Sequence, residues 1–265
     1  MPALPWIPRL TMAFALAALL GGAAVAHSRD PDDGHMVPKM VTFGGSCVKC
    51  ELAGRKLTGA RFFGANFTGA VLAGSDLRGA EFQGSNFSGA DLSHADLRGA
   101  EMTGARFPMA NFSNAAMDGV EAVGANFMNA NMTGAHLGAS QMTSANLGKV
   151  LANGASFSAA ELIGANLTSG HFDGVSFRNA SLTSANLSAS TFAGADFKGA
   201  ELIGVMLAGA DLAGARNLTQ GQLDGACIST STPLPRGLTA RLCHSHAPPP
   251  APPAPPAPPA PPSPH

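Results

Sequence analysis

The segment Gly84–Met102, GSNFSGADLSHADLRGAEM, carries a large apolar residue at every fifth position. The spacing runs from Leu52 to Leu212 without an insertion, over 33 positions that hold 15 Leu, 12 Phe and 4 Met. Only Ala122 and Ala152 depart from it. Two residues before the large residue, the chain carries Ala in most units, and otherwise Ser, Val or Gly. The chain therefore contains a long tandem repeat of five residues.

A period of five excludes the two common regular structures. In an α-helix five residues turn through about 500°, so successive large residues would spread around the helix. In a straight strand they would alternate between the two faces, because five is odd. The pattern fits a chain that turns a corner every five residues, with the large residue and the small residue two before it both facing inward. Four corners close a coil, and stacked coils bond like parallel strands about 4.8 Å apart.

Residues that lie 20 apart support a coil of four sides, because like residues recur at that spacing. One such series reads Phe67, Phe87, Phe107, Phe127, Leu147, Leu167, Leu187 and Leu207. We therefore predict an all-β fold, a square parallel β-helix of about eight coils, with inward stacks of Phe and Leu.

The repeat units in GADLSHADLRGAEM, and in GANF at Gly64–Phe67, resemble the pentapeptide-repeat family over about 165 of the 265 residues. The resemblance implies a right-handed quadrilateral β-helix, in agreement with the geometry above. Some members of this family are DNA mimics that bind DNA gyrase and protect it from quinolones, which gives one functional alternative. A DNA mimic needs a strongly acidic surface, whereas residues 51–215 carry 13 acidic and 9 basic side chains.

The N-terminal sequence is typical of a secretory signal peptide. Arg9 precedes an apolar run of about 15 residues, and Ala24-Val25-Ala26 has the small residues that signal peptidase needs. The run is short for a membrane span, although an uncleaved N-terminal anchor is the alternative. We expect an exported protein, periplasmic or secreted, with no membrane association after cleavage.

The chain divides into five predicted segments, with disordered termini. They are a signal peptide at 1–26, a flexible leader at 27–46, the β-helix at 47–215, a small C-terminal cap at 216–243 and a Pro-rich tail at 244–265. The tail repeats Ala-Pro-Pro and is expected to form an extended polyproline rod, either as a spacer or as a docking segment.

Four cysteines can pair in the oxidising compartment that export implies. We expect Cys227 and Cys243 to form a disulfide that staples the cap, and Cys47 to pair with Cys50. A Cys-x-x-Cys unit can also be a redox site, and Cys243-His244-Ser245-His246 beside Cys227 could bind a metal. A redox or metal-handling protein is therefore a second alternative.

The outward positions offer one candidate binding surface. One series at a spacing of 20 is mostly acidic: Glu81, Glu101, Glu121, Gln141, Glu161, Ser181 and Glu201. Stacked like charges are unfavourable without a cation or a basic partner, so the five Glu form a candidate interaction stripe. The alternative is a solvated face whose repulsion is relieved by Arg78, Arg98 and Lys198 one corner away. A parallel series of Asn is expected to be a structural amide ladder.

No catalytic motif, phosphate-binding loop, dinucleotide fingerprint or metal motif is evident. Charged residues make up only 12% of the chain and the net charge is -1, which argues against a nucleic-acid partner. We expect no enzyme activity, no cofactor and no resident metal. The sequence favours an exported scaffold that binds an unknown protein or cell-envelope partner, and an oligomer is compatible with it.

Local stability is expected to vary along the repeat. Pro108 lacks a backbone donor, and Ala122 and Ala152 leave inward volume unfilled. The sequence therefore predicts that the coils between about residues 102 and 152 are the least stable.

Overall fold

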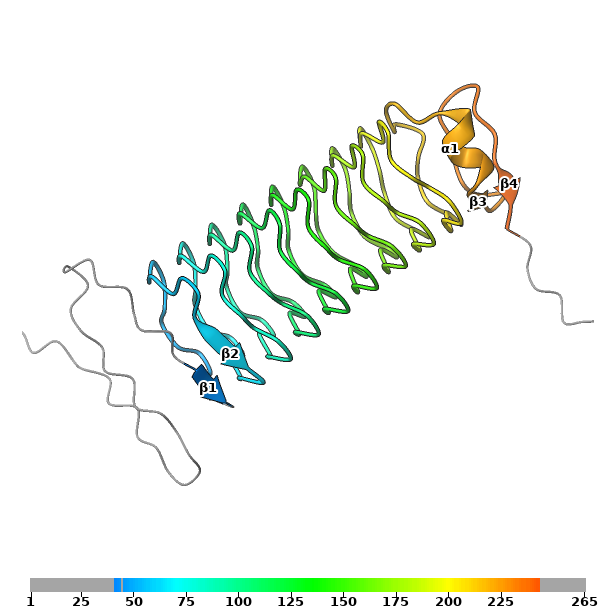
Figure 1. The fold of residues 1–265 in the computed structure, drawn as a ribbon. Coiled ribbons are helices and arrows are strands. Elements are labelled where there is room, and N and C mark those ends of the chain that lie inside the picture. Colours follow the sequence, from blue (N-terminus) through cyan, green and yellow to red (C-terminus); the bar gives the residue numbers. More distant parts are fainter. Residues whose placement is uncertain (1–40, 44, 244–265) are drawn as a thin grey trace, which may run out of the picture.

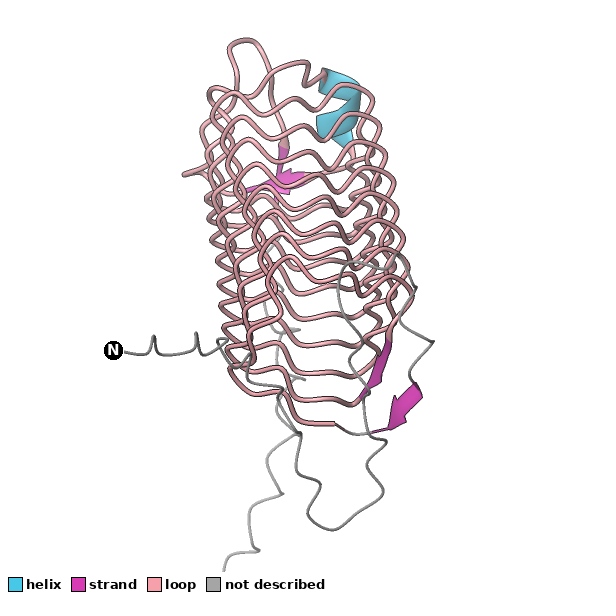
Figure 2. Cartoon of the chain, turned by 90° about the vertical axis from the view of Figure 1, so that its left-hand side faces the viewer, coloured by secondary structure: helices cyan, strands magenta, loops and turns pink. Residues whose placement is uncertain are grey.

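The computed structural model describes residues 41–43 and 45–243, which form a rod of stacked coils (Figure 1). Parallel bridges join residues that lie 20 apart, such as Asp91 with Asn111, and they recur at every fifth residue. Seen from the side, the coils lie one on another along the rod (Figure 2). The stacked β-helix predicted from the period is confirmed. Residues 1–40, Gly44 and 244–265, with the predicted signal peptide and Pro-rich tail, lie outside the described residues.

Backbone hydrogen bonds explain why the repeat has five residues. In the pentad Asp91–Ala95, the N–H groups of the first, second and fourth residues donate to carbonyl oxygens of neighbouring coils, at 2.9, 2.7 and 2.9 Å. The fifth N–H donates to the Leu92 oxygen at 3.2 Å and closes a turn. The third N–H, that of Ser93, donates to the Asp91 carboxylate at 3.0 Å. Every N–H of the pentad is therefore satisfied, and the first, second and fourth join neighbouring coils.

The turn explains the recurrent glycine. The fourth residue of every pentad from residue 49 to residue 209 has a positive φ, between 52° and 70°. A positive φ at the third residue of a four-residue turn defines type II, which favours Gly there. The chain turns so often that most of it consists of bridges and turns. Only Arg61–Phe63 (β2) extends to three residues within the coils.

Pro108 removes no hydrogen bond between coils, so the missing donor is not a reason for its coil to be weak. It is the third residue of its pentad, and the N–H at that position does not take part in the bonds between coils. It is also the second residue of the type II turn, where the fixed φ of Pro is favoured. The Pro108 carbonyl still accepts the Gly89 N–H at 2.9 Å.

The two alanines at large-residue positions are partly compensated. Val120 stands two residues before Ala122, and Val150 stands two residues before Ala152, at positions where Ala is commoner. All four side chains are fully buried. The larger Val side chain therefore fills part of the volume that a Leu or Phe would occupy. The count of large residues at the second position did not include these Val residues.

The interior is filled by stacks of like side chains, as predicted. The Phe67, Phe87, Phe107 and Phe127 rings stack along the rod with centroids 4.8, 5.2 and 5.1 Å apart. Inward serines are satisfied by carbonyl groups of the turns, as in the 2.7 Å hydrogen bond from Ser75 Oγ to the Leu72 oxygen. The core is therefore a continuous packed column.

Both ends of the rod carry extra elements. Val41–Phe43 (β1) pairs in parallel with β2, so pairing begins inside the segment that the sequence predicted to be a flexible leader. Its backbone meets the open edge of the first coil, which offers unpaired groups. The C-terminal end holds Gln220–Asp224 (α1), Cys227–Ile228 (β3) and Arg241–Leu242 (β4), with β3 parallel to β4.

Gln222 attaches the cap to the last coils. Thr219 is the N-cap of α1 and forms a capping box with Gln222, whose side chain accepts the Thr219 N–H at 2.8 Å. The Gln222 amide also donates to the Phe197 and Ala200 oxygens, both at 2.8 Å. One side chain thus begins the helix and satisfies two carbonyl groups of the coil beneath it.

Replacing Pro108 with Ala is expected to lower the free energy of unfolding by about 0.4–1 kcal/mol, because the unfolded chain gains freedom while the turn gains no bond. Met109→Pro is the matched control. It removes the Met109 N–H that donates to the Met128 oxygen at 3.0 Å, and it cannot adopt the φ of 59°. Denaturant unfolding of both variants measures the difference. A more stable Pro108→Ala protein would contradict the turn assignment.

Gln222→Ala is expected to destabilise the C-terminal end by about 1–3 kcal/mol, because it leaves carbonyl groups of Phe197 and Ala200 without donors. Hydrogen exchange of the last coils measures the loss locally. The control is Gln83→Ala, whose amide bonds only the Glu101 side chain at the surface. Equal protection in the two variants would rule out the capping role.

Candidate functional site

The outer surface is organised in four columns formed by the first residue of each pentad. We name them in chain order the Asn, mixed, Asp and Glu columns. The Asn column holds Ser46, Asn66, Asn86, Arg106, Asn126, Asn146, Asn166, Asn186 and Met206; the mixed column holds Glu51, Val71, Asp91, Asn111, Asn131, Leu151, His171, Thr191 and Asp211; the Asp column holds Lys56, Asp76, Asp96, Ala116, His136, Ser156, Ser176, Asp196 and Arg216; the Glu column holds Arg61, Glu81, Glu101, Glu121, Gln141, Glu161, Ser181 and Glu201. A face is a column together with the third and fourth residues of each of its pentads, which form the turn.

Side chains of the Asn column are used by the fold itself. The Asn66 Oδ1 atom accepts the N–H of Thr68 at 3.1 Å, and the same contact recurs along the column. Asn166 also donates to the Asn146 Oδ1 atom of the neighbouring coil at 3.1 Å. The short amide side chain therefore caps the turn and joins coils, in line with the structural ladder expected from the sequence.

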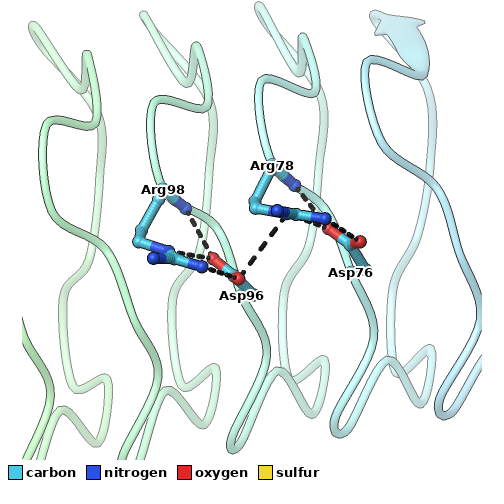
Figure 3. A network of polar contacts seen from close by, with 4 residues as sticks. All are labelled: Asp76, Arg78, Asp96 and Arg98. Atoms are coloured by element: carbon cyan, nitrogen blue, oxygen red, sulfur yellow. Dashed lines mark hydrogen bonds and ion pairs between the residues drawn. The ribbon is translucent and has the colours of Figure 1, made fainter.

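Ion pairs gather on the Asp column (Figure 3). Arg78 Nη2 lies 2.7 Å from Asp76 Oδ2, and Arg98 Nη2 lies 2.6 Å from Asp96 Oδ2. Arg78 Nε also lies 3.7 Å from Asp96 Oδ2, which links two coils. Arg78 and Arg98 are thus committed to their own face. Arg78 and Arg98 were expected to relieve the repulsion between the stacked Glu residues. They do not, because each has an Asp two residues earlier as the nearer partner.

The arginines lower the pKa values of these carboxyl groups. The hydrogen bond from Arg78 lowers the pKa of Asp76 to about 2. The hydrogen bond from Arg98 likewise lowers the pKa of Asp96, and that from Asn217 lowers the pKa of Asp196. These groups remain charged well into the acidic range, so the Asp column keeps its balance of charge.

The Glu column is satisfied only at some of its members. Arg61 Nε donates to Glu81 Oε1 at 2.7 Å, the Gln83 amide donates to Glu101, and Ser181 Oγ donates to Glu201. Within the described part of the chain, Glu121 and Glu161 take part in no hydrogen bond or ion pair of the side chain. The longer Glu side chain does not cap the turn as Asn does, so it extends into solvent.

Apolar residues accompany the acidic ones on the Glu face. The third residues of its pentads alternate between Thr and an exposed aliphatic residue in the middle of the rod. Val123 is 38% exposed, Ile163 40% and Ile203 65%. The predicted interaction stripe is therefore half of a wider surface in which carboxylates and aliphatic side chains lie next to each other.

The Asn face carries a feature that the sequence reasoning missed. Met109 is 66% exposed and Met128 is 41% exposed on the next coil. Arg106 replaces Asn in the column at the same level, and Lys149 follows two coils later. The signal was present in the sequence, because Met109 stands where most pentads have Gly.

The four cysteines form two pairs. Cys47 and Cys50 are joined across the first turn, and Cys227 and Cys243 join β3 to the end of β4. Both pairs are those expected from the sequence. The chain has four cysteines, all within the described residues, and none is free.

The residues that the structure describes contain no cluster of three His, Cys, Asp or Glu side chains that could hold a metal ion. Over the same ranges, no helix has the length and apolar character needed to cross a membrane.

The fold and its outer columns define a class of protein: a repeat protein with a packed core and regular outer faces. The family profile described as Pentapeptide repeats matches residues 46–84, 56–93, 140–179, 180–216 and 192–229, and a second profile with the same description matches 82–142. The chain belongs to the pentapeptide-repeat family. Comparison with curated proteins gives no match.

The solved structures that are similar to this one include HetL and QnrB1. HetL, involved in heterocyst differentiation regulation in the cyanobacterium Nostoc sp. strain PCC 7120, is 30% identical, with 72% of this chain and 88% of HetL covered and a TM-score of 0.66. QnrB1, a plasmid-mediated fluoroquinolone resistance protein, is 20% identical, with 71% of this chain and 92% of that one covered and a TM-score of 0.51. The second likeness concerns the fold alone.

Replacing Arg78 with Met is expected to raise the pKa of Asp76 from about 2 toward its ordinary value of 3.8. Because the pKa is depressed in the folded state, the contact stabilises the fold fully above about pH 4 and loses this effect as the pH falls through about 2. Carboxyl NMR titration of Asp76 measures the shift. Lys198→Met, on the same face but distant in sequence, should leave the pKa of Asp76 unchanged. An unchanged pKa of Asp76 in Arg78→Met would refute the assigned cause.

Proposed function

We propose that this protein is an exported, non-enzymatic scaffold whose outer faces bind a protein or cell-envelope partner. The observation that carries the proposal is the distribution of chemistry between inside and outside. The inward residues are Ala, Leu, Phe, Met, Val and Ser, almost all fully buried. The reactive and charged side chains stand in the outward columns at a repeat of about 4.8 Å. Such a surface suits recognition of an extended complementary surface.

The proposal takes the coil to be right-handed and four-sided, with about eight coils. Its support is the register of 20 residues and the four columns of bridges, together with the likeness to HetL. In this geometry the Asn, mixed, Asp and Glu faces are the four sides of the rod. Neighbouring faces then meet at about a right angle.

Export is the second part of the proposal. It rests on the signal-like sequence of residues 1–26, and the pairing of all four cysteines agrees with it. Disulfides persist in oxidising compartments and are rare where glutathione keeps thiols reduced. Paired cysteines also disfavour the redox and metal-handling alternatives, since thiolates are the ligands and nucleophiles in both.

The distribution of charge on the surface supports the alternative of a gyrase-binding DNA mimic less well. The Asp column is neutralised by Arg78 and Arg98, so the carboxylates of the Glu face do not continue around the rod. An exported protein would also not meet gyrase in the cytoplasm.

The test of export is the intact mass of the protein from fractionated cells, with and without thiol alkylation. We expect a chain that begins at His27, found in the extracytoplasmic fraction, with no cysteine alkylated before reduction. A full-length cytoplasmic chain with four alkylated cysteines would overturn the proposal and favour the gyrase-binding or redox alternatives. A Cys227→Ser variant is the control, because it should expose the Cys243 thiol to alkylation.

A further inference from the structure

Exposed apolar side chains on the Asn face gather at one level of the rod. Met109 is 66% exposed, and its N–H donates to the Met128 oxygen of the next coil at 3.0 Å, so the two residues lie on adjacent coils. Leu151, at the start of the mixed face one coil further, is 44% exposed. We call Arg106, Met109, Met128, Lys149 and Leu151 the Met patch.

The backbone at Met109 is strained without a gain inside the chain. Its φ is 59°, in the left-handed region where a side chain with a Cβ atom costs about 1 kcal/mol and Gly costs nothing. A side chain that is two-thirds exposed buries too little surface to offset this cost. The other non-Gly residues that share this φ within the described residues are Ala or polar, so Met109 is the one large apolar side chain at such a position. A large apolar side chain that is exposed there fits a contact with something outside the chain.

The charge of the Asn face limits what that contact can be. From Asn66 to Ala189 this face contains Arg106 and Lys149 and no Asp or Glu. Neither cation takes part in an ion pair within the described residues. The face therefore fits an acidic surface that also offers apolar side chains.

The same chain carries such a surface on the neighbouring side. Beyond Arg61, which pairs with Glu81 at the N-terminal end, the Glu face holds five Glu and no further Lys or Arg, with Val123 and Ile163 exposed between them. Glu121 and Glu161, the two members without a hydrogen bond or ion pair of the side chain, stand in the coils that the Met patch occupies.

The complementary groups also lie at equal levels along the rod. In chain order Arg106 falls between Glu101 and Glu121, and Lys149 falls between Gln141 and Glu161. Each step of 20 residues is one coil, so each cation is less than one coil, about 4.8 Å, from a carboxylate of the other face in height. A rotation without a shift along the axis would therefore bring the two faces together.

We propose that the Met patch of one copy docks on the Glu face of a second copy, and that four copies close into a ring of parallel rods. Two different faces meet, so the contact is heterologous, and such contacts form rings when the rotation closes. Neighbouring sides of a four-sided rod differ by about 90°, so four copies complete the circle. The absence of an axial shift gives a closed ring and not a filament. The inference deepens the proposed scaffold and rests on its four-sided coil.

The chemistry of the contact predicts its response to salt. Exposed ion pairs contribute little each and are screened by added salt, while the Met, Leu, Val and Ile side chains remain in contact. The ring is therefore expected to loosen, but not to vanish at once, as salt rises above physiological strength.

Light scattering of the purified full chain, with its disulfides intact, tests the proposal. We expect the mass of four chains at low and physiological salt. Arg106→Glu combined with Lys149→Glu is expected to give single chains, because like charges then face each other. Lys198→Glu also reverses a positive charge, but on the Asp face, and should retain the mass of four chains. A wild-type protein that is monomeric or dimeric would overturn the ring.

Two further variants separate assembly from folding. Adding Glu121→Arg and Glu161→Arg to the reversed Arg106 and Lys149 protein is expected to restore four chains, because both sides of the contact then change sign. Met109→Gly is expected to weaken assembly and at the same time raise the melting temperature of the dissociated chain, because it relieves the positive φ. Failure of the reversed pair to reassemble, or assembly unchanged in Met109→Gly, would refute the contact. Neither result bears on export, which the intact mass tests independently.

Discussion

Every feature of this molecule depends on one arrangement of hydrogen bonds, in which each pentad joins the coils on both sides of it. Three of the five N–H groups serve that stacking, one closes the turn, and the remaining one is left for a side chain. The pattern requires a residue with a positive φ at the fourth position of each pentad and a large inward residue at the second position. Local turn chemistry and core packing therefore repeat with the same period, and this agreement between levels is what specifies a single fold.

A packed interior forces the chemistry of the protein outward. Phe rings such as Phe87 and Phe107 stack at about the spacing of the coils, and the inward Ser side chains are used to satisfy turns. The outward columns are under no such constraint, apart from the use of Asn and Asp to cap the third N–H. The Glu side chains do not cap the third N–H, so the turn does not determine the composition of the Glu column.

Non-Gly residues stand at the fourth position of pentads along the whole rod, but a large apolar one stands there only at Met109 among the described residues. Arg106 interrupts the Asn column, Met109 occupies a position suited to Gly, and Lys149 has a positive φ of 58° on the same corner. Each change is tolerated because the backbone bonds do not involve side chains. Their coincidence over a few coils is a property of the surface, and the acidic face beside them carries the opposite charge.

Sequence alone determined much of this protein, since a period of five admits one regular solution and the inward residues follow from it. It also predicted the Glu column, the capped C-terminal end and both cysteine pairs. Only the tertiary structure decided the turn type, which makes Pro108 favourable, and the partners of Arg78 and Arg98, which lie on their own face. The exposed fractions of Met109 and Met128 also came from the structure, although the sequence shows Met109 at a position where most pentads have Gly. The physical reason is that the spacing of residues assigns each one to a side of the coil. The backbone angles and the ion-pair partner of each side chain follow only from the three-dimensional arrangement of the coils.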